Sequence, residues 1–452
     1  MRAKVTRATW GRELRIDLGV YVGFAAFAAV TAWATGYYGH RVWGNFGIAG
    51  YALAAVHTGA LMCHSRIAGA KDRWWQSRWL GVGAIFLVSL VAPLVYLVIR
   101  RLGGTDWQDA PHAWTAQPEV WVIERSASLL LRTGSPYIDV TGLGRPPVVD
   151  DYTPYGPVMA AFGMPRALLN EFGRAESELG RVMTDARVVF ALVACACVAL
   201  CLKLLGRPRV PVRAAQLVVA CPATALTWAV AGPDLAILGL LLLAVVLAAR
   251  DHPAWAGVVL ALVVSAKLTA APAILVLAVM LCVRSGGIAL ARFATTLLAT
   301  CAVVNLPVWL VNRRSFIENT VKFPSGSGAV ESPAASPLPG HLIAGIGPTG
   351  EVVALVLLGL AAAAITAWVL ARPPRTGADA MLRIAVGLGT AILLTPATRW
   401  GYLVYPLVLL GAGLCVPDDV DRHSAPTAPP DRAPPDRAAP ASRAEGLPTS
   451  SS

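Results

Sequence analysis

The sequence predicts an all-α polytopic membrane protein, a bundle of about 10–13 transmembrane helices. Of the 452 residues, 56% are hydrophobic and only 14% are charged, whereas a soluble domain carries roughly a quarter charged residues. So few charges could not cover a water-exposed surface of this size, but a lipid-facing surface needs no such cover. The apolar residues also form repeated segments close to the roughly 20 residues that a helix needs to cross a bilayer.

Twelve apolar segments are candidates for spanning helices, although several are shorter than a full span. They are 18–34, 46–63, 79–99, 188–205, 214–230, 235–249, 254–266, 270–283, 288–311, 352–370, 384–394 and 402–416. The seventh and eighth segments could also form one broken helix. The first segment follows a basic stretch, as in a signal peptide, but the many apolar segments after it favour an uncleaved first helix.

The positions of Lys and Arg predict the orientation, because these residues are enriched in cytoplasmic loops. The N-terminal stretch and alternate loops are basic, so we expect both termini in the cytoplasm. The net charge of +12 does not indicate nucleic-acid binding, because the basic residues are divided among short loops and form no continuous face. The composition, rich in Ala, Arg and Pro, is typical of a high-GC bacterium, and we expect the bacterial plasma membrane as the location.

The sequence contains none of the common metal or nucleotide motifs. No CxxC pair occurs among the eight cysteines, all of which lie within or at the ends of apolar segments, so neither a zinc site nor a disulfide framework is expected. GxGxxG, P-loop, HExxH and EF-hand patterns do not occur. We therefore expect no cofactor and no metal requirement.

Three parts of the chain differ in composition. Residues 1–78 hold the basic N-terminal stretch and two helices, residues 79–416 form the main transmembrane core, and the Pro-rich residues 417–452 are expected to be a disordered cytoplasmic tail. The core includes a long loop, 102–186, with eleven acidic and six basic residues. The charge pattern places this loop on the outer face.

The long loop has predictable internal structure. Residues 118–133 have a helical apolar pattern that ends at a Gly-Ser-Pro sequence. The YTPYGP sequence at 152–157 predicts a turn, and residues 159–169 could form a short interfacial helix.

A few ionisable residues lie at the ends of apolar segments, and the predicted topology places them on the outer side. They are Asp234, Lys267 and Arg399. Ionisable residues at membrane depth are costly and indicate function. Transfer of a sugar from a lipid phosphate needs a carboxylate to accept the proton of the acceptor hydroxyl. It also needs cations to stabilise the departing phosphate.

Several sequence stretches resemble glycosyltransferase family 87, the polyprenyl-phosphate-sugar-dependent mannosyltransferases of the GT-C superfamily. The stretches PEVWVIERSASLLLRTGSPY (118–137) and YTPYGP (152–157) are similar to the family's first outer loop. Similar helix and loop motifs are AGPDLAILGLLLLAVVLAAR (231–250), AGVVLALVVSAKLTAAP (256–272), SPAASPLPGH (332–341) and TPATRWGYLVYP (395–406). The resemblance covers roughly residues 80–416, so the first two helices lie outside it. It implies a GT-C-like bundle with one large extracytoplasmic loop.

The resemblance also implies an activity and a catalytic base. The protein would move a sugar, mannose in the family, from polyprenyl phosphate to a glycolipid or glycan of the cell envelope. The family has an aspartate at the start of the first loop helix, and the matching position here is Glu119, which is one methylene longer. Asp106 and Asp109 are alternative bases, and Glu119 could instead be only a charge favoured by the helix dipole.

The remaining candidates are binding residues, each with a structural alternative. Lys267 could bind the donor phosphate or extend to the membrane surface. Asp234 could contact the acceptor or Lys267, or cap the following helix. Arg399 could bind phosphate or sugar hydroxyls, although the neighbouring Trp400 is also typical of an interfacial aromatic belt.

Three further side chains complete the candidate set. Tyr152 and Tyr155 could stack on a sugar, with loop packing as the alternative, and His341 could contact phosphate. Two other functions stay open on the sequence alone. Broken midplane helices occur in transporters and flippases, and a non-catalytic partner in envelope assembly would need none of these residues.

Overall fold

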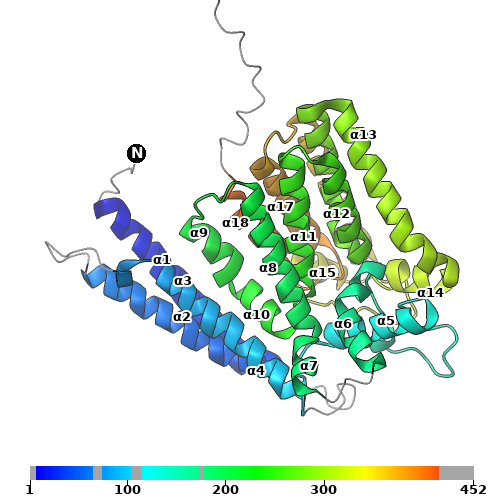
Figure 1. Ribbon diagram of the computed structural model, residues 1–452, viewed down its shortest axis with the longest axis horizontal. Helices are drawn as coiled ribbons and strands as arrows, with labels where there is room; N and C mark the ends of the chain where they lie inside the picture. Colours follow the sequence, from blue (N-terminus) through cyan, green and yellow to red (C-terminus); the bar gives the residue numbers. More distant parts are fainter. Residues whose placement is uncertain (1–6, 65–73, 104–112, 173–176, 417–452) are drawn as a thin grey trace, which may run out of the picture.

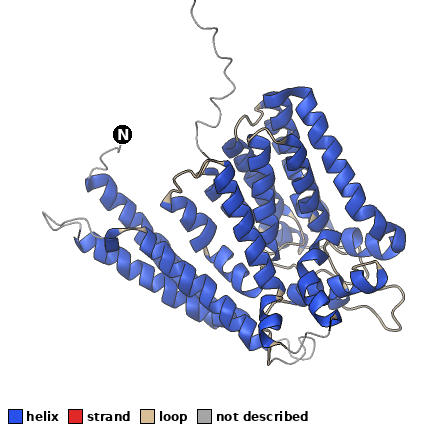
Figure 2. Cartoon of the chain, in the orientation of Figure 1, coloured by secondary structure: helices blue, strands red, loops and turns tan. Residues whose placement is uncertain are grey.

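The computed structural model of the protein describes residues 7–64, 74–103, 113–172 and 177–416. Within these ranges the chain forms helices and no strand (Figure 2), with one isolated β-bridge between Ala335 and Thr398. Eight of the described helices are long and apolar enough to cross a membrane, and three shorter apolar helices accompany them. The predicted all-α polytopic membrane protein is therefore confirmed.

The bundle follows the predicted apolar segments in order. Its helices are α1 (Arg7–Ala34), α2 (Tyr38–His64), α3 (Trp79–Ile85), α4 (Ala92–Arg101), α8 (Ala186–Leu204), α9 (Val212–Ala215), α10 (Pro222–Val230), α11 (Pro233–Ala249), α12 (Pro253–Ala266), α13 (Pro272–Val311), α16 (Pro348–Ala371), α17 (Gly377–Leu394) and α18 (Val404–Gly413). The short helices between them are α5 (Pro118–Thr133), α6 (Ala160–Glu171), α7 (Glu178–Met183), α14 (Arg313–Ile317) and α15 (Pro339–Ala344). The predicted tail at 417–452 lies outside the described residues.

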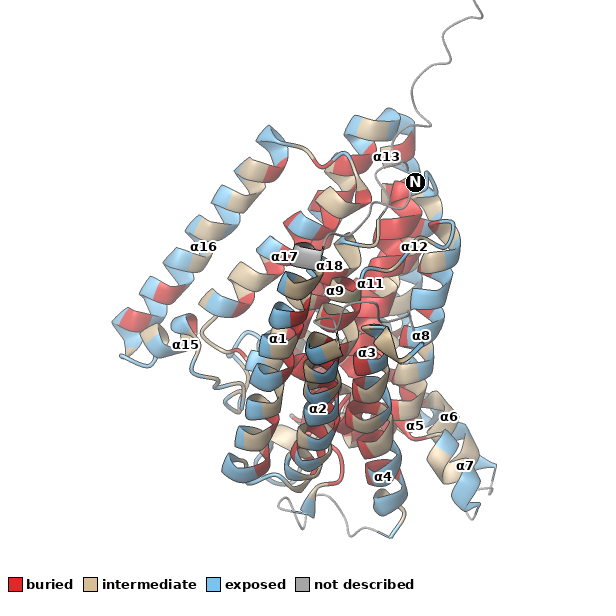
Figure 3. Ribbon diagram, turned by 90° about the vertical axis from the view of Figure 1, so that its left-hand side faces the viewer, coloured by how far each residue is buried: buried red, intermediate tan, exposed pale blue. Residues whose placement is uncertain are grey.

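Helix α11 lies at the centre of the bundle and α16 at its edge. Nearly every residue of α11 is buried, as expected for a helix that is hydrophobic all round. Only Gly350, Ala354 and Val369 are buried in α16, and Figure 3 shows this helix standing apart from the rest. The apolar outer surface of α16 is therefore suited to contact with lipid.

Helix α13 is two helices joined at Gly286. This residue has φ 81° and ψ −178°, a conformation that glycine adopts far more readily than other residues. The chain reverses direction there (Figure 1), so the two halves correspond to the separate segments predicted at 270–283 and 288–311. Between α12 and α13, Lys267 has an extended backbone, with φ −148° and ψ 115°. The seventh and eighth predicted segments are therefore separate helices.

The N-terminal helices are attached to the bundle through backbone carbonyls that lack an ordinary helical partner. Pro93 has no N–H to donate to the carbonyl of Ser89, four residues earlier. The Trp43 indole of α2 donates to this carbonyl instead, at 3.1 Å. Close to the break before α10, the Tyr51 hydroxyl donates to the Ala220 carbonyl at 2.8 Å. Both bonds fix α2 against α3–α4 and α10.

The short helices gather at one end of the bundle, which we call the loop end. Figure 1 shows α5, α6, α7 and α14 there, far from the first residues of α1. The predicted helix at 118–133 is confirmed, with Pro118 in its first turn and Gly134 (φ 74°) ending it. The predicted interfacial helix at 159–169 corresponds to α6.

Candidate active site

Two ion pairs join residues from four separate parts of the chain at the loop end. Glu119, in the first turn of α5, pairs with Arg399, which directly precedes the short helical turn Trp400–Leu403. Asp234, in the first turn of α11, pairs with Lys267 at the end of α12, with Nζ and Oδ1 2.5 Å apart. The Asp234–Lys267 pair is largely buried, whereas Arg399 of the other pair remains partly exposed.

Two tyrosines surround the Asp234–Lys267 pair. The Tyr405 hydroxyl donates to Asp234 Oδ1 at 2.7 Å. The Lys267 ammonium lies over the Tyr402 ring, 4.2 Å from its centroid, and 5.8 Å from that of Tyr405. Cation–π contact and the carboxylate together keep the ammonium charged. Tyr402 also donates its N–H to the Arg399 carbonyl at 3.0 Å, so one residue contacts a cation of each ion pair and the two pairs form one cluster.

The second carboxylate oxygen of Glu119 has no hydrogen-bond partner. Oε1 faces Arg399, whereas Oε2 is buried and meets no donor among the described residues. Buried polar atoms without a partner are rare and call for an explanation. A general base needs a lone pair directed at the proton it will accept. Oε2 of Glu119 has this property.

Tyr155 lies in the electrostatic field of both ion pairs. It is buried and interacts electrostatically with Glu119, Asp234 and Arg399. Burial, together with the Glu119 carboxylate, holds the pKa of Tyr155 well above its ordinary value. The phenol therefore stays protonated and can donate a hydrogen bond without acting as a base. Its neighbour Gly156 donates its N–H to the Ala266 carbonyl at 2.9 Å, which ties this turn to the residue before Lys267.

Gly156→Ala is expected to lower stability by about 1–3 kcal/mol through overpacking and to reduce any activity of the site. A Cβ at this position would lie 2.1 Å from the Ser265 carbonyl oxygen, so the turn would have to move away from α12. Thermal unfolding in detergent measures the effect. The control is Gly142→Ala in the exposed loop, where the nearest atom would lie 3.6 Å away. Equal melting temperatures for the two variants would contradict the prediction.

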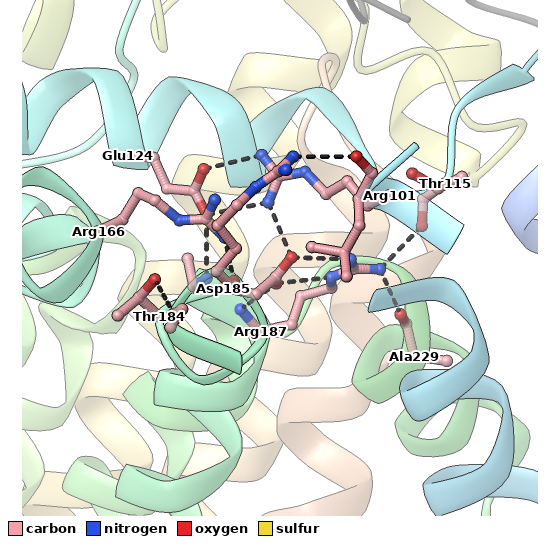
Figure 4. A network of polar contacts seen from close by, with 12 residues as sticks. Arg101, Thr115, Glu124, Arg166, Thr184, Asp185, Arg187 and Ala229 are labelled. Carbon is pink, nitrogen blue, oxygen red and sulfur yellow. Dashed lines mark hydrogen bonds and ion pairs between the residues drawn. The ribbon is translucent and has the colours of Figure 1, made fainter. Parts of the chain in front are cut away.

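A buried charge network anchors the helix that carries Glu119 (Figure 4). Glu124 of α5 accepts two bonds from Arg101 of α4, at 3.0 and 2.8 Å, and one from the Ala186 N–H at 3.1 Å. Asp185 accepts from Arg101 at 2.8 Å and from Arg187 at 2.9 and 3.0 Å. Burial disfavours the charged form of Asp185, but Arg187 and Arg101 outweigh it and hold its pKa well below the usual range. The network fixes α5 against α4 and α8.

Asp185→Asn is expected to lower stability by about 3–5 kcal/mol, because it leaves two buried guanidinium groups without one of their counter-charges. The melting temperature in detergent should fall clearly. The control is Arg132→Gln, which breaks an exposed ion pair with Glu171 and should cost about 0–1 kcal/mol. If both variants have the melting temperature of the wild type, the network does not anchor α5.

Of the other residues predicted from the sequence, His341 lies close to Arg399, whereas Tyr152 packs elsewhere in the loop. His341 donates from Nδ1 to the Pro396 carbonyl at 2.9 Å, three residues before Arg399, so its Nε2 is the acceptor in the neutral ring. Tyr152 does not reach the cluster. Its ring is 1% exposed and stacks on Phe323 with centroids 4.3 Å apart, within the core of the loop. The alternative bases Asp106 and Asp109 lie outside the described residues.

Asp150 is a candidate that the sequence patterns did not identify. Burial raises the pKa of Asp150. The Arg125 cation lowers this pKa, whereas the Glu119 and Asp151 carboxylates raise it further. A carboxyl of raised pKa close to Glu119 is a second possible base. The only sequence signal is the acidic pair directly before the YTPYGP turn. In the parts of the chain that are described, no three His, Cys, Asp or Glu side chains could together hold a metal ion.

The family model described as glycosyltransferase family 87 matches residues 152–396, more than half of the chain. No curated protein and no solved structure matches the chain significantly. The matched range includes Tyr155, Asp234 and Lys267. Arg399 lies just past its C-terminal end, whereas Glu119 lies well before its N-terminal end.

Proposed function

The chain belongs to glycosyltransferase family 87 and is a membrane glycosyltransferase, and we propose that its donor is a polyprenyl-phosphate sugar, with mannose as the sugar. The acceptor would be a glycolipid or polysaccharide of the cell envelope. Transfer would take place at the outer face of the bacterial plasma membrane, in a GT-C-like bundle whose termini are cytoplasmic. The loop end would then be the extracytoplasmic end.

The observation that carries the proposal is the unpartnered Oε2 of Glu119 within a cluster that also holds two cations. A lipid-linked donor brings an anionic phosphate and an apolar chain together. Arg399 and Lys267 supply positive charge at the end of the bundle, where a phosphate at the membrane surface could meet it. In the proposed site, the carboxylate and the two cations act on one substrate complex.

The proposed reaction is a single displacement. The acceptor hydroxyl attacks the anomeric carbon, its proton passes to Oε2 of Glu119, and the bond between that carbon and the phosphate oxygen breaks. The electron pair leaves on polyprenyl phosphate, whose charge Lys267 and Arg399 stabilise. Inversion at the anomeric carbon follows from attack opposite the leaving group.

The ion pairs suggest how the donor would prepare the site. Without substrate, each cation is neutralised by a carboxylate. A phosphate would compete with Glu119 for Arg399, because guanidinium binds phosphate and carboxylate in the same bidentate manner. Its release from Arg399 would leave the Glu119 carboxylate without its ion-pair partner at the moment the donor arrives.

Membranes that contain the protein, supplied with radiolabelled polyprenyl-phosphomannose and an envelope lipid extract, test the proposal. Label should enter a new glycoconjugate. Transfer from GDP-mannose in membranes depleted of polyprenyl phosphate would contradict the lipid-linked donor. Movement of the labelled lipid across proteoliposomes without a new glycosidic bond would instead indicate a transporter.

A further inference from the structure

The N-terminal hairpin α1–α2 lies outside the family match, yet it contacts the segment that leads into Glu119. The Gly39 N–H donates to the Trp114 carbonyl at 3.0 Å. Gln117 is two residues before Glu119, and its side-chain amide nitrogen lies 3.2 Å from Nε2 of His40. Because an amide nitrogen can only donate, neutral His40 accepts through Nε2. His40 also interacts electrostatically with Glu119.

The same hairpin contacts the residue that follows Arg399. The ring of Phe27 in α1 meets the Trp400 ring edge to face, with centroids 5.5 Å apart. The Phe27 ring also packs edge to face against Trp43 of α2, with ring centroids 6.2 Å apart. The hairpin therefore touches the chain beside both members of the Glu119–Arg399 pair.

The hairpin is held rigidly at this place. A Cβ at Gly44 would lie 2.6 Å from the Ala32 nitrogen, so α1 and α2 approach as closely as glycine allows. A Cβ at Gly39 would lie 3.2 Å from the Trp114 carbonyl oxygen. Such close packing fixes the turn between α1 and α2 relative to the start of α5.

At the end of the hairpin, Tyr37 and Trp114 present aromatic surface. Their rings are stacked, with centroids 5.7 Å apart and an interplanar angle of 8°. Tyr37 is 50% exposed. His40 and Gln117 add polar groups beside this stack. Aromatic faces next to amide and imidazole groups are suited to sugar rings, which have apolar faces and hydroxyl-bearing edges.

We propose that the α1–α2 hairpin forms an acceptor-sugar subsite next to Glu119. Tyr37 and Trp114 form its aromatic wall, and His40 and Gln117 form its polar edge. The inference rests on the proposed transferase function and adds the position of the acceptor. Trp114 and Glu119 are five residues apart, so at most about 18 Å separates their Cα atoms. This is an upper limit, and Gln117 of the polar edge is only two residues from Glu119, so an acceptor sugar or a short glycan on the wall would direct a hydroxyl toward Oε2.

Steady-state transfer by the full-length protein in nanodiscs tests the subsite, with octyl α-mannoside as acceptor and polyprenyl-phosphomannose as donor. Tyr37→Ala and Trp114→Ala should raise KM for octyl α-mannoside about 3- to 10-fold, as expected for loss of one aromatic contact. The kcat and the donor KM should stay within twofold of the wild type. Tyr37→Phe keeps the ring and should retain the wild-type KM.

Trp33→Ala is the matched control, because Trp33 lies on the same hairpin and is 90% exposed. It should leave KM unchanged. Equal losses in Trp33→Ala and Tyr37→Ala would show that these aromatics only anchor the hairpin in the membrane, and would overturn the subsite. An unchanged acceptor KM in Tyr37→Ala would also overturn the subsite.

A binding measurement separates this inference from the proposed function. Saturation-transfer NMR gives the Kd of octyl α-mannoside for the protein in nanodiscs without donor. Weaker binding in Tyr37→Ala than in Trp33→Ala supports the subsite even if the wild type transfers no mannose, in which case only the proposed function fails. Absence of binding to the wild type, or equal Kd values in all variants, overturns the subsite.

Discussion

Glu119→Gln is expected to reduce kcat for sugar transfer by about 10²- to 10⁴-fold, the usual contribution of a general base. The amide keeps the size of the side chain but cannot accept the proton of the acceptor hydroxyl. Donor KM should stay the same or fall, because Arg399 loses its carboxylate partner and becomes available to the phosphate. Transfer measured at saturating donor and acceptor, with KM for each, distinguishes the two effects.

Two other carboxylate variants make the result specific. Glu171→Gln removes a carboxylate from an exposed ion pair at the same end of the bundle and should leave kcat unchanged. Asp150→Asn removes a carboxyl that interacts electrostatically with Glu119 and whose pKa burial raises. If Glu119→Gln retains transfer within tenfold of the wild type while Asp150→Asn abolishes it, Asp150 is the base and Glu119 only pairs with Arg399.

The positions of the helices could be predicted because bilayer thickness imposes a length on each apolar segment. The loop helix α5 was equally predictable, since Pro118 and Gly134 mark its two ends in the sequence. The reversal of α13 was predicted as the break between the segments 270–283 and 288–311. The backbone conformation at Gly286 shows the residue at which the chain turns.

The residues of the cluster were predictable, and contact between Asp234 and Lys267 was one of the alternatives, but the pairing of Glu119 with Arg399 was not predicted. Asp234, Lys267 and Arg399 stand out because charge is costly near apolar segments, whereas Glu119 was indicated only by the resemblance to the family's first outer loop. Their pairing depends on tertiary contacts across 280 residues for Glu119–Arg399 and 33 for Asp234–Lys267. No periodicity within one segment carries such information.

The contacts of individual aromatic side chains were likewise not predictable from the sequence. Tyr152 and Tyr155 lie in one turn and were equivalent candidates, yet Tyr152 stacks on Phe323 and Tyr155 lies beside both ion pairs. Tyr405 looked like an ordinary residue of an apolar segment, but its hydroxyl bonds to Asp234. Side-chain direction at a turn or a helix end depends on neighbours distant in sequence, so the sequence pattern could not separate them.

Lys267→Met is expected to reduce kcat/KM by about 10²- to 10³-fold, the usual cost of losing one group that stabilises developing negative charge. It should also lower stability by about 3–5 kcal/mol, because Asp234 is left as a buried carboxylate without its counter-ion. A loss of activity in this variant alone would therefore not separate phosphate binding from folding.

The double variant Asp234→Asn/Lys267→Met separates the two roles. It removes both charges, and the amide oxygen of the introduced asparagine can still accept from Tyr405, so stability should return to within about 1.5 kcal/mol of the wild type. Transfer should not return, because the phosphate still lacks its ammonium partner. Lys322→Met, which breaks a more exposed lysine–glutamate pair, should leave transfer unchanged. Recovery of transfer together with stability in the double variant would mean that Lys267 serves the fold, and that Arg399 alone meets the phosphate.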